Sequence, residues 1–263
     1  MATKALETMR KAVALKKNSI KWYTELQSAV RDEIKQIEQN NDYTISAKSR
    51  MINELKEKRG IEIMQQIAKR KQAYLRLLNQ AKKQAEDTIY AKIKKPSDEQ
   101  VERFNVDVKH VKTKLLLAKT GDEVKNILKS FIEKIEAAGE DRAYFATEFA
   151  NQFDEIITTA LNIDSSDKMK HELKQMYERL YYELQTDDVK EAREVLDTVN
   201  ELLKKPTLFV VGPLIEQNTN YLFGKLFTQY INEPEEFFNQ PGYTEYKRTY
   251  SDKELDEYVE QEL

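Results

Sequence analysis

Apolar residues recur every three or four positions along most of this chain, which is the spacing of one face of an amphipathic α-helix. Asn40-Asn41-Asp42 interrupts the first stripe, and Thr44 or Ser46 can then accept a hydrogen bond from the first amides of a second helix. The pattern therefore predicts two helices joined by a short polar turn. The first of them spans residues 3–39 and carries Tyr23, Leu26, Val30, Ile34 and Ile37.

The second helix is the longest predicted element. Residues 46–94 contain no proline and a single glycine, Gly60, and one helix of this length would measure about 70 Å. Its apolar stripe is thin, and Arg59 and Arg70 interrupt it. Because so polar a helix is marginal alone, we expect it to pack antiparallel on the first helix or on another copy of the chain.

The middle of the chain has the pattern of a helical bundle. A capping-box pattern, "SDEQ" at residues 97–100, starts a series of five amphipathic helices with short links between them. We expect Gly121 to end the first of these helices and residues 145–160 to lie in one helix.

The pattern changes after Pro206. Four of the five prolines and many of the aromatic residues lie in the last part of the chain. We expect one helix over about residues 217–232, and then an acidic, tyrosine-rich extension with a short helix capped by Ser251 and Glu254. The predicted class is thus all-α and elongated. Its parts are a long, coiled-coil-like antiparallel hairpin arm (1–95), a helical bundle (96–205) and an irregular aromatic, acidic docking segment (206–263).

Charge divides the chain into two unlike parts. The formal net charge is −3, yet residues 1–95 carry 22 Lys and Arg against 11 Asp and Glu, whereas the remainder carries 21 against 35. Long exposed helices need charge for solubility, but a basic arm can also neutralise phosphates without reading sequence. The candidate nucleic-acid contacts are Lys69, Arg70, Lys71, Arg76, Lys82 and Lys83.

Little in the sequence points to catalysis. Cysteine is absent, and the two histidines, His110 and His171, lie on different predicted helices without carboxylates at metal-ligand spacing. We find no glycine-rich phosphate loop and no local nucleophile motif, so we expect no enzyme activity, no cofactor and no metal. The N-terminus lacks the apolar region of a secretory signal, and no apolar run approaches the length of a membrane span.

The uncharged stretch "TLFVVGPLI" (207–215) leaves three interpretations open. It can tuck over the bundle and bury Leu208, Val210 and Leu214, it can dock on another protein, or it can enter a membrane during some transition. If it docks, removal of residues 207–263 should leave a soluble helical protein that no longer joins its partner. The candidate docking residues are Phe209, Val211, Leu214, Tyr221, Phe223 and Phe227.

Two stretches carry a resemblance to a known group of proteins. "DYTISAKSRMINELKEKRGIEI" (42–63) resembles the long-helix segment of small helical proteins encoded among the head genes of tailed bacteriophages. "KKPSDEQVERFNVDVKHVKTKLLLAKTGDEVKNILK" (94–129) resembles their next segment, and the resemblance covers about residues 42–150. It implies a minor head or assembly protein, packaged and delivered with DNA, and offers no catalytic residues.

These observations favour a non-enzymatic structural or assembly protein of a phage particle, present in the virion or the host cytoplasm. We expect a homo-oligomer that associates through its long helices and docks on a capsid or portal protein through its C-terminal aromatic segment. The alternative is a protein that binds DNA non-specifically through its basic arm. A third class, an enzyme with an unrecognised helical site, would require a deep polar pocket with converging carboxylates.

Overall fold

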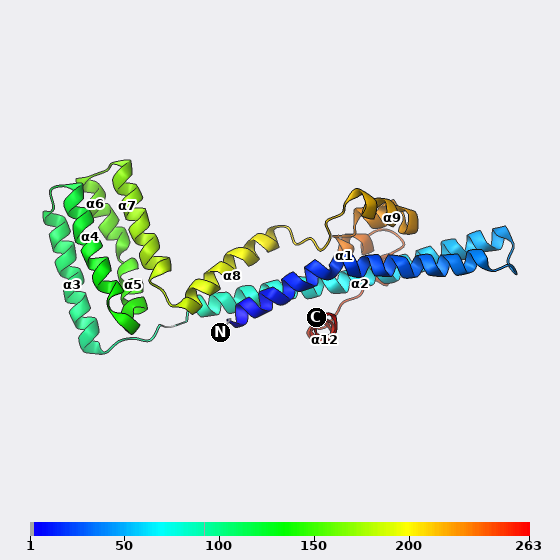
Figure 1. Ribbon diagram of the computed structural model, residues 1–263, viewed down its shortest axis with the longest axis horizontal. Helices are drawn as coiled ribbons and strands as arrows, with labels where there is room; N and C mark the ends of the chain where they lie inside the picture. Colours follow the sequence, from blue (N-terminus) through cyan, green and yellow to red (C-terminus); the bar gives the residue numbers. More distant parts are fainter. Residues whose placement is uncertain (1–2, 92) are drawn as a thin grey trace. The chain divides into compact units, whose positions relative to one another are not determined.

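The computed structural model describes residues 3–91 and 93–263, in which every regular element is helical (Figure 1). The predicted all-α class is confirmed. None of the described helices combines the length and the apolar character that crossing a membrane requires.

The chain divides into two compact units, but not at the predicted boundaries. Unit 1 joins Met1–Ala85 to Val195–Leu263, and unit 2 is Glu86–Glu194. The arm and the C-terminal segment therefore belong to one folded unit, and α8 (Asp187–Lys204) begins in unit 2 and ends in unit 1.

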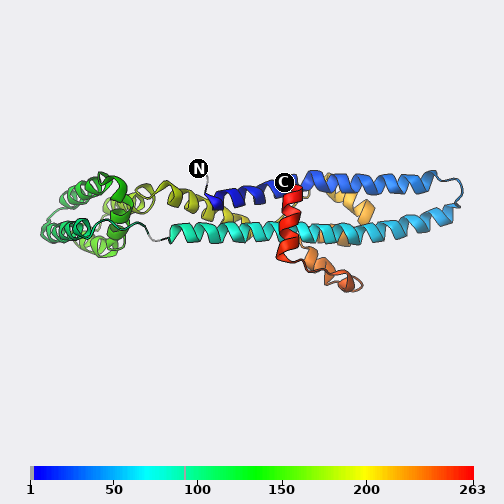
Figure 2. The same cartoon turned by 90° about the horizontal axis from the view of Figure 1, so that it is seen from below.

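Unit 1 is built on a long antiparallel hairpin of α1 (Lys4–Gln39) and α2 (Ile45–Ile89), which lie side by side in Figures 1 and 2. The Thr3 side chain accepts a hydrogen bond from the Leu6 amide at the start of α1. Of the two candidate caps for α2, Thr44 takes the role, since its hydroxyl accepts a hydrogen bond from the Ala47 amide at 3.3 Å.

Burial along the hairpin is uneven. None of residues 45–59 is buried, whereas α2 is buried at regular intervals from Gly60 to Ala85. The C-terminal residues of unit 1 contact mainly the second part of α2, although Lys56 in the first part also bonds the Tyr221 carbonyl oxygen. Towards the turn of the hairpin, in the tip (residues 31–59), Arg59 joins Glu33 of α1 at 3.0 Å.

The C-terminal residues are not an irregular tail. They form four helices and a short 3-10 turn, η3 (Thr244–Tyr246), and α9 and α12 lie against opposite faces of the hairpin (Figures 1 and 2). The four helices are α9 (Pro213–Phe223), α10 (Lys225–Gln229), α11 (Pro234–Phe238) and α12 (Asp252–Glu262).

The single helix predicted over residues 217–232 is wrong. Pro213 starts α9 four residues earlier, because proline is well suited to the first turn of a helix. Gly224 then separates α9 from α10 with φ +87°, a left-handed conformation that glycine adopts without strain.

Unit 2 is a helical bundle with its own core. It contains α3 (Asp98–Leu117), α4 (Gly121–Glu136), α5 (Arg142–Ala150), α6 (Phe153–Ile163) and α7 (Asp167–Glu178), with a 3-10 turn η1 (Gly139–Asp141) and a π-helical turn η2 (Arg179–Glu183). Residues 145–160 do not form one helix as predicted, since Asn151 and Gln152 separate α5 from α6. The core contains phenylalanines from four helices whose rings contact one another in stacked or edge-to-face pairs: Phe104, Phe131, Phe145, Phe149 and Phe153.

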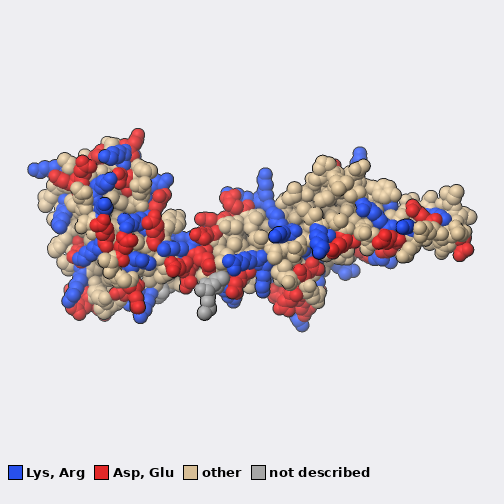
Figure 3. Space-filling view, viewed as in Figure 1, with Lys and Arg blue, Asp and Glu red and all other residues tan. Residues whose placement is uncertain are grey.

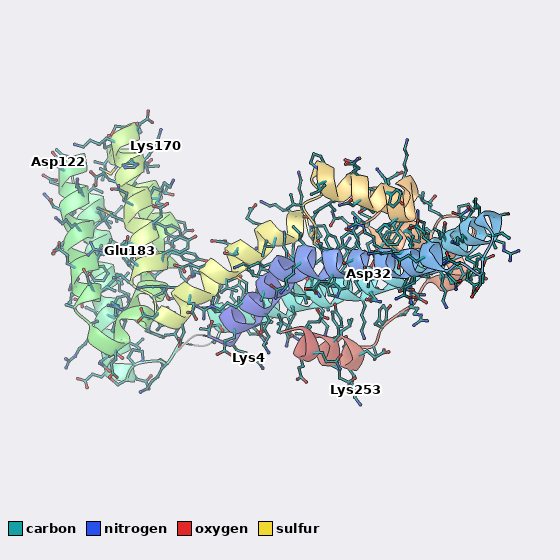
Figure 4. The ribbon with its side chains drawn as sticks, turned by 45° about the vertical axis from the view of Figure 1, so that its right-hand side comes forward. Lys4, Asp32, Asp122, Lys170, Glu183 and Lys253 are labelled. Carbon is teal, nitrogen blue, oxygen red and sulfur yellow. The ribbon has the colours of Figure 1, made fainter. Side chains whose placement is uncertain are left out.

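Gly121 has a different role from the predicted one. It does not end α3, which stops at Leu117; instead it is the first residue of α4, after the Thr120 cap. A Cβ atom at Gly121 would lie 2.3 Å from Asp164 Oδ2 and 2.9 Å from Met169 Cε. A larger residue at this position would therefore require the side chains of Asp164 and Met169 to shift. Asp122 and Lys170 lie toward this end of unit 2 in Figure 4.

Candidate interaction surfaces

The predicted nucleic-acid contacts lie on α2, and most of them contact other residues of the same chain. Arg70 is fully buried. Its guanidinium donates to Ser19 Oγ and to the Leu15 carbonyl oxygen, each at 2.9 Å, and these bonds fix it against α1. It also donates to the Tyr258 hydroxyl at 2.9 Å and pairs with Glu262, both on α12. The interruption of the apolar stripe at Arg70 is therefore a polar anchor for the C-terminal helix.

Two further basic residues also contact α12 and the turn before it. Arg76 forms ion pairs with Asp256 at 3.0 Å and with Asp252 at 3.4 Å. The Lys69 ammonium lies 5.3 Å from the centre of the Tyr258 ring and 5.6 Å from that of Tyr250. In the folded chain, residues of α12 and the turn before it thus occupy part of the surroundings of these two cations.

The other three basic candidates are not held by α12 in the contacts described. Lys71 donates to the Asn232 carbonyl oxygen, on the side of the hairpin that carries α10 and α11. Lys82 is half-buried and Lys83 is exposed. The six candidates thus do not form one open basic surface.

Local sequence explains why α12 forms. Ser251 and Glu254 make a reciprocal capping box, as predicted, and the amide of Ser251 holds the pKa of the Glu254 carboxyl below its usual value. Leu255 and Val259, one turn apart, are buried on the hairpin side. Burial raises the pKa of Tyr258 to about 12 despite its contact with Arg70, whereas Lys253 points away from the hairpin (Figure 4).

The aromatic docking candidates separate into buried and exposed residues. Phe209 and Phe227 are buried, with ring centres 5.4 Å and 6.5 Å from that of Tyr23 on α1. Phe223 is half-buried and packs on Phe227 and against Gly60. These three residues attach the segment to its own hairpin, so the prediction that they form a docking face is wrong for the folded chain.

The remaining docking candidates lie toward solvent. Leu214 and Tyr221 are 71% and 65% exposed, while Val211 is half-buried. The interpretation in which the stretch tucks over the bundle is correct only in part, because Leu208 is buried but Val210 and Leu214 are not. Moreover, the segment belongs to unit 1, where Phe209 packs on Tyr23 of the hairpin.

Polar residues that the sequence patterns did not single out hold this segment in place. The Asn232 side chain accepts from the amides of Leu208 and Phe209 and donates to the Phe209 carbonyl oxygen, at 2.9 to 3.0 Å. Thr219, fully buried on α9, bonds the Tyr23 hydroxyl and the Gln27 amide at 3.0 Å. Burial raises the pKa of Tyr23 to about 12.

The outer surface of α9 carries a single charged residue, the exposed Glu216. Leu214, Gln217 and Tyr221 share one side of the helix, while Thr219 and Leu222 face the hairpin. In Figure 3 a broad area of uncharged residues covers this part of unit 1. At one edge Lys56 lies 4.2 Å from the centre of the Tyr221 ring. Exposed apolar residues gathered on one rigid helix mark an interaction site more often than isolated ones do.

Among residues 3–91 and 93–263 we found no group of three or more side chains suited to hold a metal ion. Comparison of the chain with protein-family models, with curated proteins and with solved structures gave no match.

Proposed function

We propose that this protein is a non-enzymatic structural or assembly protein that docks on a partner protein through the outer face of α9. One observation carries the proposal: Val210 just before α9, and Leu214 and Tyr221 on it, are 73%, 71% and 65% exposed, and Glu216 is the one charged residue between them in a chain that is 34% charged. Large apolar side chains held in water by a folded segment gain free energy when a partner covers them.

The backbone that carries the docking face is held in place by the rest of unit 1. Asn232 holds the backbone before α9, and Thr219 and Leu222 fix the helix against α1 and α2. Because the backbone is already ordered, a partner would lose less conformational entropy on binding than it would with a disordered segment.

The charges at the rim define the partner's chemistry. Lys56 donates to the Tyr221 carbonyl oxygen at 3.0 Å and covers one edge, and the exposed Lys225 follows α9. A complementary protein surface would have an apolar centre, carboxylates opposite Lys56 and Lys225, and a cation opposite the exposed Glu216.

The resemblance of residues 42–63 and 94–129 to phage head-gene proteins supports a partner in an assembling phage particle, of the capsid or portal kind. The test is to isolate particles on a density gradient from cells that produce the natural chain or a variant. We expect the natural chain to sediment with particles and Leu214→Asp to stay in the soluble fraction.

Leu117→Asp is the matched control, because Leu117 is 74% exposed and lies in unit 2. This variant should sediment with particles like the natural chain. Equal incorporation of Leu214→Asp would contradict docking through α9, and absence of the natural chain from particles would contradict the phage assignment.

We also propose that the hairpin tip associates with a second copy. Ile37, Ile52 and Leu55 remain half-buried there, and Ile45 is 86% exposed. Residues 31–59 carry seven basic and six acidic side chains, so two tips can approach without net repulsion and complete a four-helix arrangement.

Light scattering over a range of protein concentrations tests this contact. We expect the natural chain to dimerise and Ile45→Asp to need roughly tenfold more protein to do so, since a buried isoleucine contributes about 1.5–3 kcal/mol. Ile45 lies largely in water, so the substitution should not change the helix content. A chain that stays monomeric at every concentration would refute association through the tip.

A further inference from the structure

Helix α12 lies across the hairpin and covers a line of cations on α2 (Figure 2). Lys69, Arg76 and Lys83 are seven positions apart, so they follow one face of α2 at intervals of about 10 Å. Arg70 lies beside the first of them, and α12 contacts all but Lys83 in the interactions described. α12 itself carries six carboxylates and one lysine.

We propose that this face of α2 binds single-stranded nucleic acid and that α12 is its intramolecular competitor. The inference goes beyond the assembly role, because it assigns a ligand to residues that play no part in docking through α9. In the free protein, carboxylates of α12 occupy the positions that phosphates would take.

The attachment of α12 is weak enough to be displaced. α12 has 11 residues, of which Leu255 and Val259 are buried and Tyr258 is half-buried. Asp252 and Asp256 are largely exposed, and ion pairs in water contribute about 0–1 kcal/mol each. Short helices with few buried contacts open at a lower free energy than the rest of a fold.

Release of α12 would leave the cations in need of anions. Arg70 would keep its bonds to Ser19 and Leu15 but lose Glu262, the carboxylate that neutralises it. A guanidinium held in a largely buried position without a counter-ion is unfavourable. A phosphate bound there would replace the negative charge that Arg70 loses when Glu262 leaves with α12.

An aromatic ring beside the cations favours nucleic acid over an acidic protein. The Trp22 ring centre lies 4.7 Å from the Arg70 guanidinium, on α1. Single strands bind to surfaces that combine a line of positive charge with a ring on which bases stack. An acidic protein would use the cations but would not need the indole.

Trp22 is the sole tryptophan of the chain, so its fluorescence reports on this site. The experiment titrates the full chain with a 20-nucleotide oligo(dT) in low salt and follows both tryptophan quenching and the anisotropy of a labelled oligonucleotide. The first variant is Asp252→Asn/Asp256→Asn/Glu262→Gln, which removes the ion pairs of α12. The second is Leu255→Asp, which removes an apolar anchor and makes the chain more acidic.

We expect both variants to bind oligo(dT) at least tenfold more tightly than the natural chain, with Trp22 quenched. Adding Lys83→Gln to either variant should weaken its binding to oligo(dT). The affinity should fall with a log-log salt slope of about −3, the value for roughly four neutralised phosphates on a single strand.

The matched control is Asp98→Asn/Asp167→Asn/Asp187→Asn. It removes three almost fully exposed carboxylates from unit 2 and makes the same change in net charge. It should bind like the natural chain.

Equal tightening by this control, or no tightening by either α12 variant, would overturn the proposal. Polyglutamate that quenches Trp22 as strongly as oligo(dT) would also overturn it, in favour of an acidic protein ligand. None of these results bears on the α9 docking test, so the two proposals can fail separately.

Discussion

Two buried tyrosines of the hairpin differ in what their hydroxyl groups contact. Tyr23 exchanges a hydrogen bond with Thr219 of α9, so its hydroxyl links the hairpin to the C-terminal segment. The Tyr74 hydroxyl is buried and has no hydrogen-bond partner among the described residues. An unpaired buried hydroxyl costs free energy, whereas a paired one offsets its own desolvation.

The pair gives a prediction at the scale of single residues. Tyr74→Phe should raise the free energy of unfolding by about 1 kcal/mol, because it removes a polar group that bonds nothing. Tyr23→Phe should lower it by about the same amount, because Thr219 and Gln27 lose a partner. Urea denaturation followed by circular dichroism measures both changes. Equal losses in the two variants would show that the Tyr74 hydroxyl is paired in solution.

At the scale of helices, Gly60 and Gly121 differ in how much space surrounds them. Gly60 lies within α2, and a Cβ atom there would meet Phe223 Cδ1 at 3.5 Å, an ordinary contact. Gly121 lies at the start of α4, where a Cβ atom would overlap Asp164. The Asp164 side chain is itself engaged, since it accepts a hydrogen bond from the Ser166 amide before α7, which lowers the pKa of its carboxyl.

We therefore predict opposite effects of the same substitution. Gly60→Ala should stabilise the protein by about 0.5–1 kcal/mol, because alanine loses less backbone entropy in a helix. Gly121→Ala should destabilise it by about 1–2 kcal/mol, because Asp164 must leave its bond to Ser166. Thermal unfolding of the two variants checks the signs. A stable Gly121→Ala protein would mean that Asp164 moves freely.

The whole chain is organised as one unit inserted into another. Unit 1 is made from both ends of the sequence, and unit 2 is continuous and has its own aromatic core. This arrangement changes the expectation for removal of residues 207–263. The deletion would remove Phe209 and Phe227 from their contacts with Tyr23 of the hairpin and expose buried residues of the hairpin, so a soluble folded remainder is not expected.

Fragments test this organisation. Residues 96–186 alone should be helical and unfold cooperatively in urea, because the fragment keeps the phenylalanine core of unit 2. Residues 1–95 alone should lose helix or aggregate, because their covering segment is missing. Circular dichroism and light scattering distinguish these outcomes. A well-folded 1–95 fragment would show that the hairpin does not depend on residues 195–263.

The sequence by itself determined the helices and many of their ends. The stripes of α1, α3 and α4, the capping boxes at Ser97 and Ser251 and the turn at residues 40–43 all follow from interactions between residues at most four positions apart. Such local interactions recur whenever the same residues occur in the same order, so their pattern is enough to predict them.

Only the tertiary structure decided which faces are covered. Arg70 and Glu262 are 192 positions apart, and Tyr23 and Thr219 are 196 positions apart. The unusual features of the sequence, such as the arginine in an apolar stripe and the acidic C-terminus, indicated that these residues need partners but could not identify them. A charged or apolar residue can pair with many others far along the chain, so its type does not identify its partner. The fold selects one set of partners through the combined burial of many residues.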